Sequence, residues 1–449
     1  MCENEGVLIS FAVENYAGFA EKSLLTLGDA AIINRYRNPP KNNTWQDHVE
    51  RLAGIFGANA SGKSTFLSAI VCLTRAISTP NYFRDAVEAL YRPFKTRYHD
   101  YDNYPSSFEL DGVFANQRWE YQVAVDNQGV VSEYLTTWEG SYRRKIIERT
   151  RQEIWINWGR EKNISRKNIA EVIPRKSLAV TMASLFEHPD AGKFCTAIRE
   201  DFAFIRPEEA DKQARHAWLT EALLKRPEWA QVVNMVLQVA DLGISGFRVN
   251  EEVVPNKYVR IAKRINEVIN SELGEEGQTQ EVELEDEEAQ QMATALVLRH
   301  RLNGKEIDFN LEEESRGTIA WLSVAIPAIY MLVNGKTLVC DELDDSLHPS
   351  LVALLVSLYN NPRVNTKGAQ LVFNTHDVSL LERYPEAILK REEIWFSEKD
   401  ANGNCALYSL PEGVRKENNI AKLYFQGALG GMPYPQSLAL EKLVSEFNG

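Results

Sequence analysis

Residues 54–65 read Gly-Ile-Phe-Gly-Ala-Asn-Ala-Ser-Gly-Lys-Ser-Thr (GIFGANASGKST) and match the pattern G-x-x-x-x-G-K-[ST]. Glycines in such a loop let successive backbone N–H groups turn inward and surround phosphate oxygens. Residues 52–56 are apolar and read as a buried strand, and residues 65–73 read as a buried helix. The helix would point its positive end at the same oxygens. This order of strand, loop and helix predicts a nucleotide site.

Each polar position of the loop has an expected role. Lys63 would reach the β and γ phosphates, and Ser64 would ligate Mg²⁺. The other residues expected to contact nucleotide are Gly57, Asn59, Ser61, Gly62 and Thr65. The alternative is a glycine turn followed by a chance Lys-Ser pair, and the flanking strand and helix argue against it. The loop therefore predicts ATP and Mg²⁺ as cofactors.

The bulk composition is that of an ordinary globular protein, with 449 residues, 44% hydrophobic and 25% charged. That length allows two or three domains, or one large domain with insertions. No apolar run approaches a membrane span, and the start (MCENEGVLIS) lacks a signal-peptide pattern. The five cysteines are scattered without a C-x-x-C motif, which indicates reduced thiols. We expect a cytoplasmic protein with no membrane partner.

The net charge of −13, from 50 basic and 63 acidic residues, argues against a surface coated in positive charge for nucleic acid. A local basic groove remains open. Much of the acid lies in residues 271–288 (SELGEEGQTQEVELEDEE). This run predicts a solvated, mobile connection, with a partner-binding segment as the alternative.

Before the acidic run, the pattern predicts strands and then helices. Strands are expected at residues 7–11 and 23–27, joined through residues 15–18. Residues 108–139 alternate apolar and polar, which predicts an antiparallel meander with turns at 111–112 and 127–129; residues 155–158 are a candidate extension. Helical text covers 176–239, broken by prolines, and 257–273, without the sustained heptads of a coiled-coil rod.

After the acidic run, strands are expected at 293–300 and 306–311, followed by a helix from 315 to 333. Buried strands at 337–340 and 370–374 and a strand pair around 393–396 and 406–408 complete the pattern. We interpret the two ends as halves of one sheet. The predicted division is an N-terminal lobe at 1–175, a helical insertion at 176–292 and a C-terminal lobe at 293–449.

A second motif, Thr337-Leu-Val-Cys-Asp-Glu-Leu343, is an apolar strand that ends in two carboxylates. Asp341 would hold Mg²⁺, directly or through water, and Glu342 is placed to act as general base on the attacking water. Strands often end in acids by chance. Together with the glycine-rich loop, the pattern predicts a catalytic pair.

A third apolar strand ends in Asn374-Thr-His-Asp377. His376, at the carboxyl end of this strand, could hydrogen-bond a γ-phosphate or the attacking water, and its place one strand after Glu342 favours this over a structural role. Between the two strands, residues 345–349 (DSLHP) read as a loop and helix start, with His348 as a surface residue.

Glu314-Ser-Arg-Gly-Thr318 opens a helix, and Ser315 with Gly317 could form a second phosphate site there. The alternative is a plain N-cap at Ser315. One chain cannot easily aim both sites at a single γ-phosphate. Two chains can, so this motif predicts a homodimer that encloses ATP.

In this order the motifs resemble the ABC-type ATPase head of SMC and RecF-like proteins. The resemblance implies an α/β P-loop ATPase head with an antiparallel β meander and a helical insertion. In it, residues 315–317 stand at the signature motif, 346–348 at the D-loop and His376 at the switch histidine. The 252 residues from Lys63 to Ser315 (315 − 63) exclude transporter subunits. The Q-loop glutamine is not evident; Gln117 and Gln122 are weak candidates.

A narrower resemblance is to AAA-domain ATPases of bacterial abortive infection and phage defence, including RloA-like and AbiL-type proteins. The segments that carry it are 11–19 (FAVENYAGF), 57–64, 314–318, 341–349 (DELDDSLHP), 367–381, 391–400 (REEIWFSEKD) and 415–434. That family usually has Thr-Thr-His-Asp where this chain has Asn374-Thr-His-Asp, a difference we expect to leave the chemistry unchanged. Arg316 replaces a commoner acid or small residue.

The resemblance implies a separately encoded effector, often a nuclease or TOPRIM-like protein, which such ATPases hold or trigger. We therefore expect an ATPase that dimerises around ATP and controls an effector in anti-phage defence. Without an acidic metal cluster beyond Asp341 and Glu342, a built-in nuclease is not expected. The alternative is a RecF-like DNA-repair ATPase with no effector. A non-hydrolysing platform is a further alternative, against which Glu342 argues.

Overall fold

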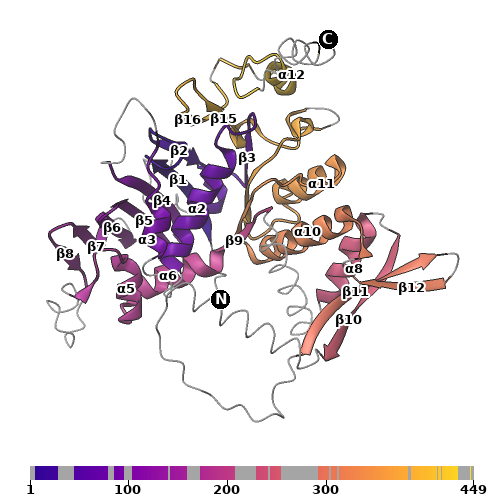
Figure 1. The fold of residues 1–449 in the computed structure, drawn as a ribbon, viewed down its shortest axis with the longest axis horizontal. Coiled ribbons are helices and arrows are strands. Elements are labelled where there is room, and N and C mark those ends of the chain that lie inside the picture. The colour runs from indigo at the N-terminus through magenta and orange to yellow at the C-terminus, as the bar shows by residue number, and fades with distance from the viewer. Residues whose placement is uncertain are drawn as a thin grey trace. The chain divides into compact units, whose positions relative to one another are not determined.

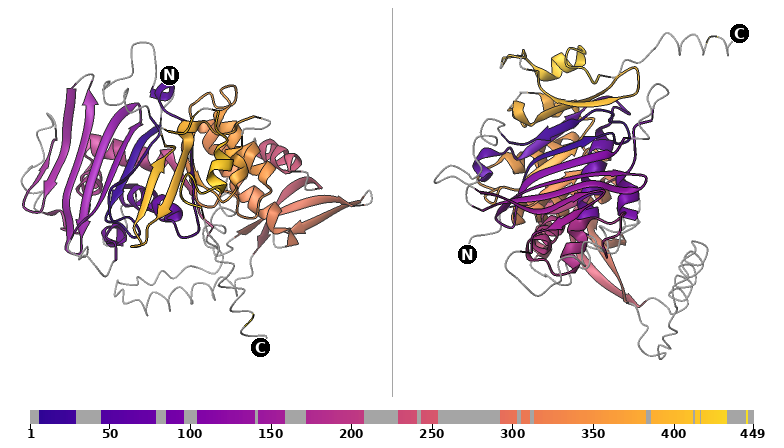
Figure 2. Two further views of the ribbon diagram at one scale, coloured as in Figure 1. Left: turned by 90° about the horizontal axis from the view of Figure 1, so that it is seen from above. Right: turned by 90° about the vertical axis from the view of Figure 1, so that its left-hand side faces the viewer.

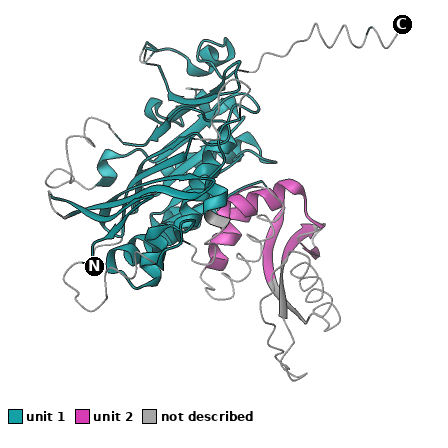
Figure 3. Cartoon of the chain, turned by 60° about the vertical axis from the view of Figure 1, so that its left-hand side comes forward, with its two compact units in different colours: residues 1–207, 327–449 teal, residues 208–326 magenta. Residues whose placement is uncertain are grey.

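The computed structural model describes residues 6–28, 45–78, 85–95, 104–139, 142–158, 172–207, 229–240, 243–253, 292–302, 305–310, 313–382, 386–411, 413–415, 417–432 and 445. The predicted helix at 257–273 and the acidic run at 271–288 lie outside these residues. The chain divides into two compact units, Met1–Pro207 with Pro327–Gly449 and Glu208–Ile326 (Figure 3). The division of the chain into lobes at 1–175 and 293–449 with an insertion at 176–292 remains a prediction from the sequence.

A six-stranded sheet in the first unit joins the two ends of the chain, as predicted. Its order is β16-β15-β3-β14-β13-β9, and all neighbours are parallel except β15 and β16. The strands are β3 (Leu52–Phe56), β9 (Phe202–Ile205), β13 (Thr337–Cys340), β14 (Gln370–Asn374), β15 (Ile394–Lys399) and β16 (Cys405–Ser409). The strands β3, β13 and β14 are buried along their whole length, as in parallel sheets covered on both faces.

The strand β9 corrects the prediction that residues 176–239 are helical pieces separated only by prolines. That region holds α5 (Ala179–Leu185), α6 (Pro189–Asp201), β9 and α8 (Trp229–Val239). The four residues of β9 follow α6 directly and pair in register with β13, Phe202 opposite Thr337. A four-residue segment has too little periodicity to reveal a strand. Its conformation depends on a partner strand far along the chain.

A seven-stranded antiparallel sheet of order β2-β1-β4-β5-β6-β7-β8 confirms the predicted meander and extends it (Figure 2). Its strands are β1 (Val7–Glu14), β2 (Ser23–Thr26), β4 (Ser106–Phe114), β5 (Gln117–Asp126), β6 (Gly129–Glu139), β7 (Tyr142–Thr150) and β8 (Ile154–Ile156). The candidate extension at 155–158 contributes to β8, the edge strand.

The predicted turn at Asp111-Gly112 is wrong, because both residues lie inside β4. The chain turns instead at Ala115 and Asn116, which both have positive φ (50° and 60°), the geometry of a two-residue hairpin turn. Asp111 is held in the strand by two hydrogen bonds from Arg118 on β5, at 3.1 and 2.7 Å. The ion pair explains why an Asp-Gly pair does not turn here.

The helix α2 (Lys63–Ser78) contacts both sheets of the first unit, so its buried face forms the centre of the core (Figure 1). Phe66 meets Phe11 and Phe19 edge-on, with ring centroids 5.6 and 5.7 Å apart. Further elements of this unit are η1 (Trp45–His48), α3 (Asp85–Leu90), α11 (Pro349–Asn360), η5 (Val378–Leu381), η6 (Arg391–Glu393) and α12 (Ile420–Phe425). Packing in the core therefore anchors the helix that follows the glycine-rich loop.

A fully buried carboxylate ties the meander to α5. Glu133 on β6 accepts hydrogen bonds from the backbone N–H groups of Ala179 (2.6 Å) and Val180 (2.8 Å). It also accepts from the Tyr121 hydroxyl at 3.0 Å, and Arg149 lies 3.8 Å away. Burial raises the pKa of Glu133, whereas Arg149 and the hydrogen bonds lower it. The first turn of α5 thus obtains its acceptor from a strand side chain.

The second unit contains the antiparallel sheet β10 (Ile244–Val253), β11 (Met292–Leu302) and β12 (Lys305–Asn310). This confirms the strands predicted at 293–300 and 306–311. The helix α8 contacts β10, and the Trp321 indole N–H donates to the Val236 carbonyl at 2.7 Å.

The helix α10 (Arg316–Asn334) has 19 residues and a mean hydropathy of 1.5, so by length and composition alone it could cross a membrane. The expectation that no apolar run approaches a membrane span is wrong for this helix. Its few polar residues, such as Ser323, interrupt the apolar run but leave the mean hydropathy high enough for a membrane-spanning helix. More than half of the most apolar 18-residue stretch of this helix (56%) is buried inside the protein, as is common for a core helix. The absence of a membrane partner stays a prediction.

Candidate nucleotide-binding site

Two glycines of the loop at 57–62 are required by close backbone contacts. A Cβ on Gly57 would collide with the Ser397 carbonyl oxygen on β15. Gly62 has a φ of 105°, and a Cβ there would lie 2.8 Å from the Cβ of Cys405. Only glycine tolerates these positions. The loop is therefore drawn tightly against β15 and β16.

Ser61 shows that the loop suits a phosphate. Its hydroxyl is buried and has no hydrogen-bond partner among the described residues. Its carbonyl accepts a hydrogen bond from the Ser397 hydroxyl at 2.7 Å. Buried polar atoms in native proteins rarely lack a partner, and an oxyanion in the loop would supply one.

Lys63 begins α2, with only 6% of its surface exposed. Its ammonium group donates to the carbonyl oxygens of Gly57 (2.8 Å) and Ala58 (2.9 Å). Burial lowers the pKa of Lys63, while the nearby carboxylates of Asp341, Asp344 and Glu342 raise it. The three carboxylates thus lie close enough to the loop to act on its cation.

The two predicted magnesium ligands come together through a third side chain. The Asn374 amide group donates to the Asp341 carboxylate at 2.5 Å and to the Ser64 hydroxyl at 3.3 Å. Oxygen ligands of this kind suit Mg²⁺. Asn374 was not among the predicted site residues. The one feature of the sequence that could have drawn attention to Asn374 is that the similar family usually has threonine at this position.

Glu342 has a φ of 54°, in the left-handed region. Burial raises its pKa, and so do the charges of Asp341 and Asp345, whereas His376 lowers it. The backbone N–H of His376 points at the Asp344 carboxylate, 3.2 Å from each oxygen. The structure therefore places the predicted base and the predicted switch histidine within electrostatic reach of each other.

The remaining predicted residues have more local contacts. Asn59 is exposed and Thr65 half-buried at the start of α2. His348 caps α11 and accepts from the backbone N–H of Ser350 at 3.2 Å. Ser315 accepts from the backbone N–H of Thr318 at 3.1 Å, the contact expected of an N-cap. Ser315 and Gly317 belong to the second unit, so their phosphate role stays a prediction.

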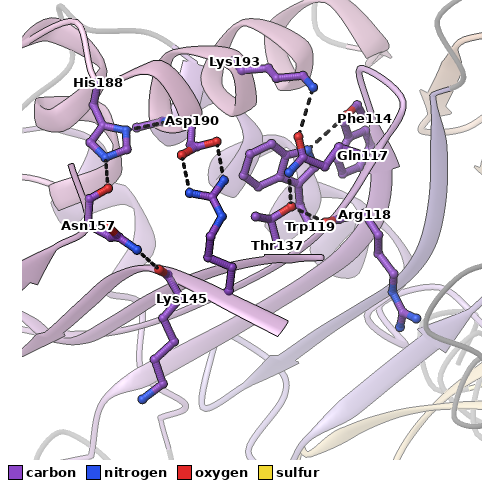
Figure 4. Close-up of polar contacts among 12 residues, drawn as sticks. Phe114, Gln117, Arg118, Trp119, Thr137, Lys145, Asn157, His188, Asp190 and Lys193 are labelled. Carbon is purple, nitrogen blue, oxygen red and sulfur yellow. Dashed lines mark hydrogen bonds and ion pairs between the residues drawn. The ribbon is translucent and has the colours of Figure 1, made fainter. Parts of the chain in front are cut away.

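Of the two Q-loop candidates, Gln117 is engaged elsewhere (Figure 4). Its amide donates to the Thr137 hydroxyl at 2.5 Å and accepts from the Lys193 ammonium at 3.0 Å. These contacts join β5, β6 and α6. Gln122 is exposed on β5. Neither position has a contact with the glycine-rich loop among those that the structure describes.

A pocket of about 590 Å³ lies beside the loop. It is lined by Ala17, Gly18, Tyr91, Arg92, Pro93, Phe94, Lys95, Lys399 and Gly403. Cys405 links the two features, since a Cβ on Gly18 or on Gly62 would lie 2.9 Å from its sulfur. Sequence reasoning missed this pocket, because its walls come from three separate segments, at 17–18, 91–95 and 399–403.

A C-terminal glycine pair packs against the same loop. Gly430 and Gly431 both have left-handed φ (69° and 63°). A Cβ on Gly431 would lie 3.1 Å from the Ser397 oxygen and 3.3 Å from the Cα of Gly57. The Tyr424 hydroxyl holds this segment by donating to the Gly431 carbonyl at 3.1 Å.

We predict that Gly431→Ala weakens ATP binding by about tenfold, because the added methyl group would press on Gly57 and displace the loop backbone. The left-handed conformation of the alanine would separately lower the stability of the protein. Titration with a fluorescent ATP analogue measures the change. Gly413→Ala is the control, since nothing lies within 4 Å of a Cβ at Gly413. If Gly431→Ala protein is less stable but binds ATP with wild-type affinity, the contact between Gly431 and Gly57 does not affect nucleotide binding.

Comparison with known proteins places this site in a family. The protein-family model described as "AAA domain, putative AbiEii toxin, Type IV TA system" matches residues 52–382. No curated protein matches the chain. Among solved structures, the SMC head domain from Thermotoga maritima is 13% identical, with a TM-score of 0.40, 90% of this chain covered and 99% of that one.

Two further SMC heads, each solved with a domain of ScpA, show comparable similarity. The first is 11% identical with a TM-score of 0.39, and 90% of this chain and 98% of that one are covered. The second, from Pyrococcus furiosus, is 13% identical with a TM-score of 0.36, and 90% and 96% are covered. Since the matched model spans most of the chain, from β3 to η5, this protein belongs to that AAA-domain family and has an α/β P-loop ATPase fold.

Proposed function

We propose that this protein binds ATP with Mg²⁺ and hydrolyses it. The observation that carries the proposal is the Asn374 amide, which joins the Ser64 hydroxyl to the Asp341 carboxylate beside Lys63. Lys63 would neutralise charge on the β and γ phosphates, and Ser64 with Asp341 would hold the metal. Mg²⁺, when bound, offsets charge that develops on the phosphate oxygens.

Glu342 would accept a proton from the attacking water. Its raised pKa makes it a stronger base than an exposed glutamate, which suits this role. His376 is exposed, its charge lowers the pKa of Glu342, and it would contact the γ-phosphate or the water. The pocket beside the loop, with Arg92, Lys95 and Lys399 in its wall, would receive the nucleoside.

We further propose that two chains enclose ATP, with Ser315 and Gly317 of one chain facing the loop of the other. The exposed position of Ser315 at the start of α10 supports this. The dimer would control a separately encoded effector in abortive infection, as in RloA-like and AbiL-type ATPases. The family description, which refers to an AbiEii toxin and a type IV toxin–antitoxin system, agrees with such a role.

DNA binding in the RecF manner is the alternative function. The basic run at residues 143–145 does not support it, because acidic side chains neutralise these charges. Arg143, Arg144 and Lys145 on β7 are each paired with an acid: Glu120, Asp190 and Glu148. Tight DNA binding by the purified protein, falling steeply with salt, would favour this alternative.

Native mass spectrometry of Glu342→Gln protein, purified from its own operon with and without Mg²⁺ and ATP, tests the proposal. We expect ATP to produce a nucleotide-filled dimer or its multiples, with a neighbouring gene product gained or lost. A protein that stays monomeric with ATP bound would contradict the shared site, and Ser315 would then be a helix cap alone.

A further inference from the structure

Asn374, the last residue of β14, is almost completely buried, with 1% of its surface exposed. Both ends of its amide are used. The nitrogen donates to Asp341 at 2.5 Å and to Ser64 at 3.3 Å, and the oxygen accepts from the backbone N–H of Glu342 at 2.5 Å. One side chain at the end of β14 therefore contacts the residues that follow the neighbouring strand β13 and the start of α2.

The backbone at Glu342 needs such support. A left-handed conformation is unfavourable for a residue other than glycine and persists only where its surroundings hold it. The Asn374 side chain accepts from the N–H of Glu342, and the Asn374 carbonyl accepts from the N–H of Leu343 at 3.1 Å. The N–H of Asp345 closes a turn onto the Glu342 carbonyl at 2.9 Å. Asn374 thus clamps the peptide on both sides of Glu342.

We propose that Asn374 is a positioning residue that fixes the metal-binding pair Ser64 and Asp341 and the base Glu342 in one arrangement. This inference rests on the proposed function. It also revises the expectation that asparagine in place of the usual threonine has no consequence. Threonine has one polar side-chain atom where asparagine has two, so it cannot make all three contacts.

The nature of the amide explains why one residue can serve both groups. Its donor end faces the oxygens of Ser64 and Asp341, and its acceptor end faces a backbone N–H. An aspartate would lose the donor and place a second negative charge against Asp341. A leucine would leave the Glu342 N–H without its buried acceptor. Asparagine satisfies both requirements at this position.

The test compares wild-type protein with Asn374→Thr and with Asn374→Ser, a smaller variant in case threonine prevents folding. Asn365→Thr is the matched control, because Asn365 is also buried and its amide makes three hydrogen bonds, to Tyr359 and Ala369. The measurements are Mn²⁺ affinity in the presence of ATP by electron paramagnetic resonance, kcat and KM for ATP, and thermal stability.

For the Asn374 variants we expect Mn²⁺ affinity to fall by about 10–100-fold, as for residues that orient metal ligands. We expect kcat to fall by about 100-fold, since misplacing a reacting group by 1 Å can cost that much, and KM for ATP to rise by no more than the loss in metal affinity. Asn365→Thr should lose stability and keep wild-type kcat and Mn²⁺ affinity. Asn374 variants that behave like Asn365→Thr would overturn the inference alone. A wild-type protein that binds no Mn²⁺ with ATP would overturn the proposed function and this inference together.

Discussion

Glu342→Gln is expected to lower the rate of ATP hydrolysis by about 10²–10⁴-fold, the usual contribution of a general base. Glutamine has nearly the same shape but cannot accept the proton of the attacking water. Nucleotide affinity should stay close to that of wild type, because Lys63, Ser64 and Asp341 are unchanged. Single-turnover hydrolysis measures the rate, and equilibrium titration with ATP measures the affinity.

The pH dependence of the wild-type rate gives a second view of the same group. Burial and the charges of Asp341 and Asp345 raise the pKa of Glu342. A base acts in its deprotonated form, so the rate should rise with pH and reach half its plateau above the ordinary glutamate pKa of about 4.3. Glu382→Gln, at an exposed position, is the control. Hydrolysis by Glu342→Gln protein at the wild-type rate would show that Glu342 is not the base, whereas an absence of hydrolysis above background in both proteins would revive the non-hydrolysing platform.

Glu133→Ala is expected to lower the free energy of unfolding by about 3–5 kcal/mol, the cost of breaking a buried charged contact from one side. The substitution leaves the N–H groups of Ala179 and Val180 without their acceptor and the Arg149 guanidinium without its carboxylate. Denaturation by urea at neutral pH measures the change.

The matched control is Glu120→Ala on the neighbouring strand β5. Glu120 is paired with Arg143, whose side chain is half exposed at 52%, and it lies 4.0 Å from Arg118, which keeps its two hydrogen bonds to Asp111 in the variant. Losing Glu120 should therefore cost only about 0–1 kcal/mol. Equal losses in the two variants would show that the Glu133 network does not stabilise the fold beyond a surface ion pair.

The sequence alone was enough for features whose chemistry lies within a few consecutive residues. The loop at 57–64 and the carboxylates that follow β13 can be recognised from their spacing, because the residues of each motif are close together in the sequence. The meander was also predictable, since alternation along each strand reports which side chains face the core. The motifs further indicated an AAA-domain ATPase family, and the comparison confirmed the family at that coarser level.

Other features depended on partners remote in the chain. β9 is a strand because it pairs with β13, and Asp111 stays in β4 because Arg118 binds it. Asn374 looked like a neutral difference in sequence, yet its amide joins Ser64, 310 residues earlier, to Asp341. Such contacts follow from the packing of the sheet, which brings strand ends from both halves of the chain to one edge. No local pattern of residues encodes that meeting, so the tertiary structure alone decided it.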